Sequence, residues 1–279
     1  MTDTANPRVL LLDIDGTLLN YRTELPPSAA DAVRQARARG HRVYLCTGRS
    51  RAEIYDHLWD LGVDGLIGGN GSYVEDAGQV VFHQVLDAAV VAEAVEWLVA
   101  EDLGFYLECN SGLYASDHLP EKAAALLDGG ATPANVQFIR DAMPDLIYGT
   151  RSGRDDVNKI SFALHPDVDL DALTTRYAGR AAINSWSMTG TRDEFGEFGQ
   201  LGIHKGAAIE RLIGHLGVSA DDLIGFGDAR SDLGMFAACG TSVAMGNAPD
   251  EVKAAATLVT DHVDADGLAN AFRRLGLIA

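Results

Sequence analysis

Residues 8–20 of this 279-residue chain read RVLLLDIDGTLLN, and this stretch decides the fold. It opens with a short apolar run ending at Asp13, which is typical of a strand buried on both faces of a parallel sheet. In such a sheet, ligands bind beyond the carboxyl ends of the strands. Because side chains alternate along an extended backbone, Asp13 and Asp15 can point the same way while Ile14 turns towards the core.

Two close carboxylates at a buried strand end repel each other, and this costs free energy unless a cation or a shared proton offsets it. The pair of acids at Asp13 and Asp15 therefore suggests Mg²⁺. Since Asp and Gly are also ordinary turn residues, an acidic turn that merely ends the strand explains the same letters equally well. The residues at the ends of the other strands decide between these two interpretations.

The composition limits the classes of protein that the chain can belong to. With 47% hydrophobic and 22% charged residues, it can bury a large core and form two domains, or one domain with an insertion. The formal net charge of −18 argues against nucleic-acid and membrane partners. The N-terminus lacks a signal-peptide pattern, so we expect a cytoplasmic protein, and the three cysteines suggest neither a disulfide framework nor a zinc site.

Strand and helix patterns alternate at both ends of the chain. Near the start we expect strands at 8–13, 41–47 and 65–68, with helices at 28–39 and 51–61. Near the end we expect strands at 223–227, 242–245 and 257–259, with helices at 205–216, 231–238 and 249–255. This βαβ pattern predicts that the two ends form one parallel, doubly wound sheet.

The middle of the chain has a different, α+β texture. It predicts a helix at 88–101, a hairpin of 105–108 with 113–116, a loop near 128–133, and strands at 158–164 and 181–188. A sheet that begins at one end and resumes at the other implies an inserted domain. The expected domains are a core of residues 1–85 and 194–279 and an insertion of residues 86–193.

Two further segments place phosphate-binding groups at the same sheet edge. Thr47 and Gly48 come after the second strand and offer a hydroxyl and an amide, although Thr47 is also a good helix cap. Lys205 stands at a helix start, where the helix dipole favours acids, so an anionic neighbour is expected. A solvated lysine is the alternative. A phosphate site in so acidic a chain needs such isolated cations and a metal ion.

A second pair of acids, Asp228 and Asp232, comes after the strand predicted at 223–227. Carboxylate oxygens from two strands, with water and a substrate phosphate, would complete a magnesium site. Each of these signals is moderate alone. Their joint position after successive strands of one sheet makes the combined interpretation specific.

Together these segments resemble the haloacid dehalogenase superfamily, and within it the Cof-type phosphatases of subfamily IIB. The resemblance is carried by Asp13-Ile14-Asp15-Gly16-Thr17, Thr47-Gly48-Arg49, Lys205-Gly206, Gly227-Asp228 with Asp232, Gly69-Asn70-Gly71, and Ala244-Met245-Gly246-Asn247-Ala248. It implies a Rossmann-like α/β core with an inserted α+β cap domain of the C2B type.

The resemblance also implies roles for the acids. Asp13 would attack phosphorus and form an aspartyl-phosphate, while Asp15 would protonate the leaving alcohol and then activate water. Mg²⁺ would be held by Asp13, the Asp15 backbone carbonyl and Asp228, and Asp232 would order the outer shell.

The phosphoryl oxygens would be held by Thr47, the Gly48 and Ile14 amides, and Lys205. One departure concerns Ser231, because the family's last motif usually reads GDxxND and has Asn at this position. The shorter Ser231 hydroxyl either contacts phosphate, directly or through water, or only caps the next helix. We expect altered efficiency or substrate choice rather than lost chemistry.

The inserted domain should select the substrate, and its candidate specificity residues are Tyr106, Glu108, Asn110 and Lys159, each equally well explained as ordinary surface. The leading hypothesis is a Mg²⁺-dependent phosphatase, monomeric or homodimeric, that acts on a small phosphorylated metabolite such as a sugar phosphate. The alternatives are a phosphosugar mutase of the same superfamily and a non-catalytic phosphometabolite-binding protein.

Overall fold

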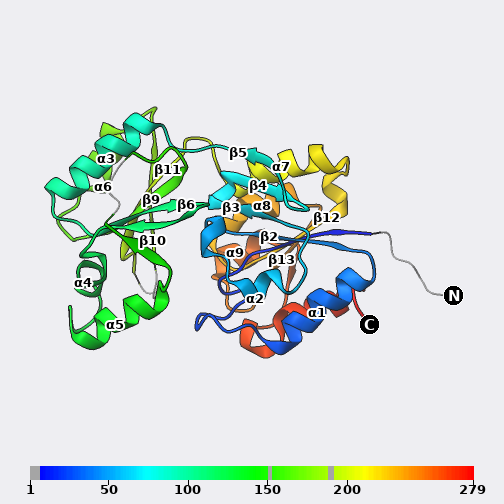
Figure 1. Ribbon diagram of the computed structural model, residues 1–279. Coiled ribbons are helices and arrows are strands. Elements are labelled where there is room, and N and C mark those ends of the chain that lie inside the picture. The colour runs from blue at the N-terminus through cyan, green and yellow to red at the C-terminus, as the bar shows by residue number, and fades with distance from the viewer. Residues whose placement is uncertain (1–6, 150–152, 188–191) are drawn as a thin grey trace. The chain divides into compact units, whose positions relative to one another are not determined.

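The computed structural model describes residues 7–149, 153–187 and 192–279 (Figure 1). It divides into two compact units. The first contains residues 7–49, Ile54–His83 and Ile203–Ala279, and the second contains Ser50–Glu53 and Gln84–Gly202. Among the described residues, none of the helices combines the length and the apolar character needed to cross a membrane.

The first unit is built on an eight-stranded sheet in the order β14-β13-β12-β1-β2-β3-β4-β5. Its strands are β1 Val9–Leu12, β2 Arg42–Cys46, β3 Gly65–Gly68, β4 Tyr73–Asp76, β5 Gln79–His83, β12 Leu223–Gly227, β13 Thr241–Ala244 and β14 Leu258–Val259. The strands from β14 to β3 pair in parallel, and β4 and β5 add an antiparallel edge. Since β1 pairs with β12, the two ends of the chain form one sheet, as predicted.

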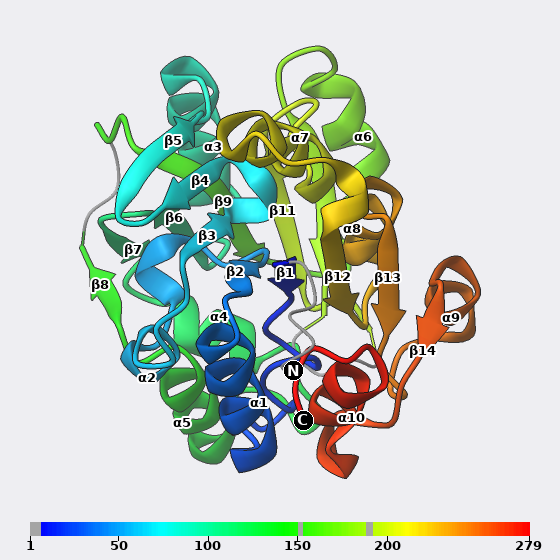
Figure 2. The ribbon, with the colours of Figure 1, turned by 90° about the vertical axis from the view of Figure 1, so that its right-hand side faces the viewer.

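Helices cover both faces of this sheet because β1 is apolar on both sides. Leu10 and Leu12 pack in the core beneath α1 (Pro27–Ala38), α2 (Asp56–Trp59) and α10 (Gly267–Arg274). Val9 and Leu11 pack on the other face, beneath α7 (Lys205–Leu216), α8 (Leu233–Ala238) and α9 (Asp250–Ala255). Figure 2 shows α1 and α10 side by side. Burial of apolar strands on both faces is what a parallel sheet requires.

The second unit has a six-stranded sheet in the order β10-β11-β9-β6-β7-β8. Its strands are β6 Phe105–Cys109, β7 Gly112–Ala115, β8 Leu146–Tyr148, β9 Val157–Ala163, β10 Ala182–Trp186 and β11 Phe195–Gly199. Helices α3 (Ala88–Ala100) and α6 (Leu170–Arg176) pack on one face, and α4 (Leu119–Ala124) and α5 (Pro133–Ala142) pack on the other. The unit has the α+β texture expected for the middle of the chain.

Two expectations along the chain are corrected. The helix predicted at 51–61 is broken into a 3₁₀ turn, Arg51–Glu53, and the short α2, because Tyr55 between them is extended, with φ −61° and ψ 140°. The insertion, expected to end at residue 193, continues to Gly202, because β11 pairs with β9 and β10 in the second sheet.

Two smaller differences concern the start of one helix and an additional hairpin. The helix predicted at 231–238 opens with a 3₁₀ turn, Arg230–Asp232, and continues as α8. The hairpin of β4 and β5 was not predicted and extends the first sheet. Met188, the end of the strand predicted at 181–188, lies outside the described residues, whereas β10 forms within that prediction.

Candidate active site at the ends of three parallel strands

Three neighbouring strands of the first unit carry polar residues at their carboxyl ends. Asp13 comes directly after β1, Thr47 after β2 and Asp228 after β12, and these strands pair in parallel in the order β12-β1-β2. Parallel strands place their carboxyl ends at the same edge of the sheet. The sequence predicted this convergence, and all three side chains are buried.

A buried lysine joins two of the predicted acids. The Nζ atom of Lys205 donates to Oδ1 of Asp13 at 2.7 Å and to Oδ1 of Asp232 at 2.6 Å. Lys205 is the first residue of α7, and the His204 side chain caps this helix by accepting from the Ala207 amide. The anionic neighbours expected for Lys205 are therefore carboxylates of the protein, and their charge raises the pKa of its ammonium despite burial.

Asp232 is fixed from both of its oxygens. Its Oδ2 atom accepts from the amides of Asp228 and Ala229, both at 2.9 Å, while Oδ1 accepts from Lys205. The adjacent strand end must be glycine, because a Cβ atom on Gly227 would lie 2.4 Å from Cγ of Asp232. This geometry suits Asp232 to holding the backbone at Asp228 in place.

Asp228 receives hydrogen bonds from three side chains. Thr17 donates to its Oδ1 atom at 3.1 Å, and Asn247 donates to Oδ2 at 3.2 Å. The Tyr21 hydroxyl also donates to Oδ2. A side chain at Gly16, whose φ is 84°, would collide with this carboxylate, since its Cβ would lie 2.2 Å from Oδ2. Thr17 and Asn247 fall within the segments quoted for the resemblance, but sequence reasoning gave them no role.

Burial and mutual repulsion raise the pKa values of Asp13 and Asp228. Burial is the main cause of the raised pKa of Asp13; the Asp232 carboxylate adds to it and the Lys205 ammonium opposes it. Burial also raises the pKa of Asp228 to about 6. In both cases the charged form is disfavoured because water is excluded.

The three buried acids fit a divalent cation. Carboxylate oxygens of Asp13, Asp228 and Asp232 lie within 4.8 Å of one another. Three carboxylates against the single ammonium of Lys205 leave an excess of negative charge. An all-oxygen donor set of this kind suits Mg²⁺.

Asp15 has a different environment from Asp13. Arg49 binds its carboxylate with a two-pronged contact, Nε to Oδ2 at 2.9 Å and Nη2 to Oδ1 at 2.7 Å. The Asp15 side chain is 47% exposed, whereas Asp13 is buried. The Arg49 guanidinium also lies over the Tyr55 ring, 4.8 Å from its centre. The sequence placed Arg49 in a motif without predicting that it would bind Asp15.

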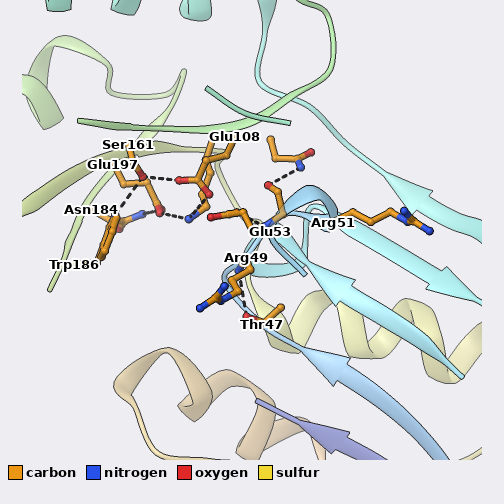
Figure 3. A network of polar contacts seen from close by, with 12 residues as sticks. Thr47, Arg49, Arg51, Glu53, Glu108, Ser161, Asn184, Trp186 and Glu197 are labelled. Atoms are coloured by element: carbon orange, nitrogen blue, oxygen red, sulfur yellow. Dashed lines mark hydrogen bonds and ion pairs between the residues drawn. The ribbon is translucent and has the colours of Figure 1, made fainter. Parts of the chain in front are cut away.

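The remaining predicted phosphate ligands lie at or beside this strand edge. The Thr47 hydroxyl accepts from the Arg49 amide at 3.2 Å, so it stabilises the local turn, and it can also donate to a ligand (Figure 3). Gly48 is partly buried, and Ile14 is the residue between the two acids. Ser231 is exposed in the 3₁₀ turn that precedes α8.

The structure brings together Glu108 and Lys159 of the second unit. Lys159 Nζ lies 3.0 Å from Oε2 of Glu108 and 2.9 Å from Oε2 of Glu197. The Ser161 hydroxyl donates to Oε1 of Glu108 at 2.6 Å (Figure 3). Sequence reasoning missed Glu197 and Ser161, although both alternate with the apolar residues of their strands.

Tyr106 and Asn110 have different surroundings within the second unit. Tyr106 is buried, and its pKa is raised by burial and by the Glu108 carboxylate. The Asn110 side chain accepts from the Arg51 amide at 3.2 Å and from Nδ2 of Asn158 at 2.9 Å. Asn110 therefore anchors the short segment Ser50–Glu53 to the sheet of this unit.

The sheet order, the strand-end acids and the buried lysine define a haloacid dehalogenase-like hydrolase. The family model of that description matches residues 10–272, so the chain belongs to this family. The predicted family and α/β fold are thereby confirmed, and so is the predicted class of hydrolase.

Named relatives narrow the class to phosphatases that act on phosphoric monoesters. Phosphatase YwpJ of Bacillus subtilis is 25% identical over 96% of this chain and 99% of its own length. Pyridoxal phosphate phosphatase YbhA of Escherichia coli is 25% identical over 94% of this chain and 96% of its own. The solved structure of BT4131, described as a subclass IIB sugar phosphatase, has the same fold, with a TM-score of 0.76, 23% identity and coverage of 97% of this chain and 100% of its own.

Proposed function

We propose that this chain is a Mg²⁺-dependent phosphatase that hydrolyses a small phosphorylated metabolite, such as a sugar phosphate, through an aspartyl-phosphate on Asp13. The observation that carries the proposal is the contact of Lys205 with Asp13 beside Asp228 and Asp232. This contact brings a carboxylate and a cation together at the end of β1, beside two further buried acids, which supports a nucleophile next to a metal site. Phosphoryl transfer mainly requires such positioning and charge stabilisation.

In the first step an Asp13 carboxylate oxygen attacks phosphorus. The bond from phosphorus to the leaving oxygen breaks with its electron pair, and that oxygen takes the proton of the Asp15 carboxyl group. The Lys205 ammonium, already bonded to Oδ1 of Asp13, offsets the charge on the phosphoryl oxygens. Thr47 and the amides of Ile14 and Gly48 would bind the same oxygens.

In the second step a water oxygen attacks phosphorus of the aspartyl-phosphate, and the Asp15 carboxylate takes its proton. The bond between phosphorus and Asp13 breaks, which restores the Asp13 carboxylate and releases phosphate. The two hydrogen bonds from Arg49 fix the plane of the Asp15 carboxyl group. Arg49 therefore orients the carboxyl group that gives up a proton in the first step and takes one in the second.

Asp13, the Asp15 backbone carbonyl and Asp228 would hold Mg²⁺, and Asp232 would order its outer shell. When bound, Mg²⁺ would supply positive charge that offsets these carboxylates and the charge on the phosphoryl oxygens. The excess negative charge and the raised pKa of Asp228 support this assignment. Ser231, beside Asp232, is the candidate for an additional phosphate contact.

The second unit would recognise the leaving group. Its candidate residues are Tyr106, Glu108, Asn110 and Lys159, of which Glu108 and Lys159 form one charged cluster with Glu197. Relatives named for pyridoxal phosphate and for 5-amino-6-(5-phospho-D-ribitylamino)uracil support a small phosphorylated metabolite as the substrate.

The test is phosphate release from p-nitrophenyl phosphate with Mg²⁺, with EDTA, and by Asp13→Asn. We expect turnover with Mg²⁺, little with EDTA, and a loss of about 10⁴-fold or more in the variant, as for other removed nucleophiles. Robust turnover without metal, or an unimpaired variant, would refute the proposal. A panel of sugar, nucleotide and cofactor phosphates, ranked by kcat/KM, would then identify the substrate, and transfer to a sugar hydroxyl rather than water would indicate a mutase.

A further inference from the structure

Tyr21 combines an exposed ring with a buried hydrogen bond. It comes directly after the Asp13–Asn20 segment, and it is 67% exposed. Its hydroxyl nevertheless donates to Oδ2 of Asp228, a carboxylate that is only 2% exposed. This surface tyrosine therefore contacts a buried acid of the proposed metal site, and none of the motifs gives it a role.

The turn that carries Tyr21 is held on both sides. The Asn20 side chain accepts from the amides of Arg22 at 2.9 Å and Glu24 at 3.0 Å. The same side chain donates to Oε2 of Glu24 at 2.9 Å and to Oδ1 of Asp264 at 3.0 Å. The backbone on either side of Tyr21 is therefore fixed, and the direction of its ring does not depend on the contact with Asp228 alone.

The donors to Asp228 are divided unequally between its two oxygens. Oδ2 accepts from both Tyr21 and Asn247, whereas Oδ1 accepts from Thr17 at 3.1 Å. Asn247 is itself anchored, since its Nδ2 atom also donates to the Gly16 carbonyl at 2.8 Å and its Oδ1 atom accepts from the Val263 amide at 3.0 Å. Since a carboxylate oxygen has about two acceptor sites, Tyr21 and Asn247 together fill those of Oδ2, whereas Thr17 leaves one site of Oδ1 for a cation.

We propose that Tyr21 is a positioning residue for the metal: its hydroxyl orients Asp228 and thereby strengthens Mg²⁺ binding. This inference rests on the metal dependence in the proposed function. Hydrogen bonds to a metal-ligating carboxylate typically change metal affinity by about 10–100-fold. If the hydroxyl instead occupied the place of the cation, its removal would tighten binding.

The experiment is calorimetric titration of Mg²⁺ into the full chain without substrate, comparing wild type with Tyr21→Phe. The substitution removes only the hydroxyl from an exposed ring, so the fold is expected to be retained, which circular dichroism will check. We expect Mg²⁺ affinity to fall by about tenfold or more. The Mg²⁺ concentration for half-maximal turnover should rise by the same factor, with a smaller change in kcat at saturating Mg²⁺.

Tyr44→Phe is the matched control. The Tyr44 hydroxyl also donates to an aspartate of the first unit, Oδ1 of Asp76 at 2.8 Å, but neither residue belongs to the proposed metal site. This variant should lower the unfolding midpoint and leave Mg²⁺ affinity unchanged. Equal or tighter Mg²⁺ binding by Tyr21→Phe overturns the inference alone, whereas a wild-type chain that binds no Mg²⁺ overturns the metal dependence of the proposed function as well.

Discussion

In each unit, a lysine lies buried between two carboxylates. In the first unit, Lys205 lies 2.7 Å from Asp13 and 2.6 Å from Asp232. In the second, Lys159 lies 2.9 Å from Glu197 and 3.0 Å from Glu108. The two triads have the same charges and similar distances, yet only the first is expected to carry the reaction.

The difference lies in how the chain assembles each triad. Glu108 and Lys159 are directly opposite each other on β6 and β9, so the second triad results from strand register. Asp13, Lys205 and Asp232 come from loops and a helix start, and Asp13 is 192 residues from Lys205 in the chain. A further carboxylate, Asp228, adjoins the first triad and leaves charge for a metal to neutralise.

Buried ion triads are therefore weak evidence of catalysis on their own, because structural networks produce them too. What distinguishes the first triad is its position at the carboxyl ends of parallel strands and the absence of side chains at Gly16 and Gly227. Those two glycines allow Asp228 and Asp232 to approach the backbone closely.

The largest expected effect is a difference in kcat between variants of the two buried lysines, Lys205 and Lys159. Lys205→Met should lower kcat by about 10²–10³-fold, because it removes the cation beside Asp13. Lys205→Met and Lys159→Met should each lower the free energy of unfolding by about 3–5 kcal/mol, since each variant leaves buried carboxylates uncompensated. The kcat of Lys159→Met for p-nitrophenyl phosphate should fall far less than that of Lys205→Met. Urea unfolding and steady-state kinetics on both variants measure this, and equal losses of kcat would contradict the comparison.

The next effect concerns Asp228, the further acid that lies beside the first triad. The folded-state pKa of Asp228 is raised from 3.8 to about 6, so its contribution to stability is present below pH 4 and is lost as the pH rises through 6. In EDTA, wild type should lose up to about 3 kcal/mol relative to Asp228→Asn between pH 4 and pH 7. Excess Mg²⁺ should remove this loss by binding the ionised form.

Urea unfolding of both proteins at pH 4, 5, 6 and 7 gives the required difference, in which the titrations of groups distant from Asp228 cancel. A difference that stays constant with pH would show that Asp228 does not titrate as the structure indicates.

A smaller effect is expected from the Arg49 contact with Asp15. Arg49→Lys loses the planar fork that fixes the carboxyl group, so kcat should fall by about tenfold, with little change in stability because the pair is partly exposed. Arg37→Lys is the matched control, since Arg37 binds Asp64 with the same two-pronged geometry. Steady-state kinetics should show no loss of kcat for the control, and equal losses would exclude a specific role for Arg49.

The smallest effect should come from Ser231→Asn, which introduces the residue that is usual at this position of the family's GDxxND motif. Because Ser231 is exposed, the free energy of unfolding should stay within about 0.5 kcal/mol of wild type. The longer amide should change kcat/KM by less than about tenfold, measured across the phosphate panel. A loss of all turnover would show that the serine is required rather than tolerated.

The first sheet, and the edge of it where the candidate site residues lie, were predictable because the signals are local and repeated. Apolar runs punctuated by Asp13, Thr47 and Asp228 specify buried parallel strands and the edge where they end. Lys205 was noticeable in the sequence because it is a cation at a helix start, where the helix dipole favours acids. In the structure it contacts two carboxylates.

The parts that could not be predicted depend on contacts between distant segments. The second unit ends at Gly202 rather than at residue 193, because β11 pairs with β9 and β10. No local sequence pattern indicates such pairing. The Arg49 contact with Asp15 and the Tyr21 contact with Asp228 depend on side-chain directions in loops. Periodicity does not specify those directions.

The short segment Ser50–Glu53 has a consequence for protein engineering. In sequence it stands between two stretches of the first unit, but by its contacts it belongs to the second unit. There, Nδ2 of Asn158 donates to the Ser50 hydroxyl at 2.9 Å. The polypeptide therefore passes between the units four times rather than twice. A graft of residues 84–202 alone onto a related enzyme would remove the Arg51 amide from Asn110 and the Ser50 hydroxyl from Asn158, so a transplanted second unit should include residues 50–53.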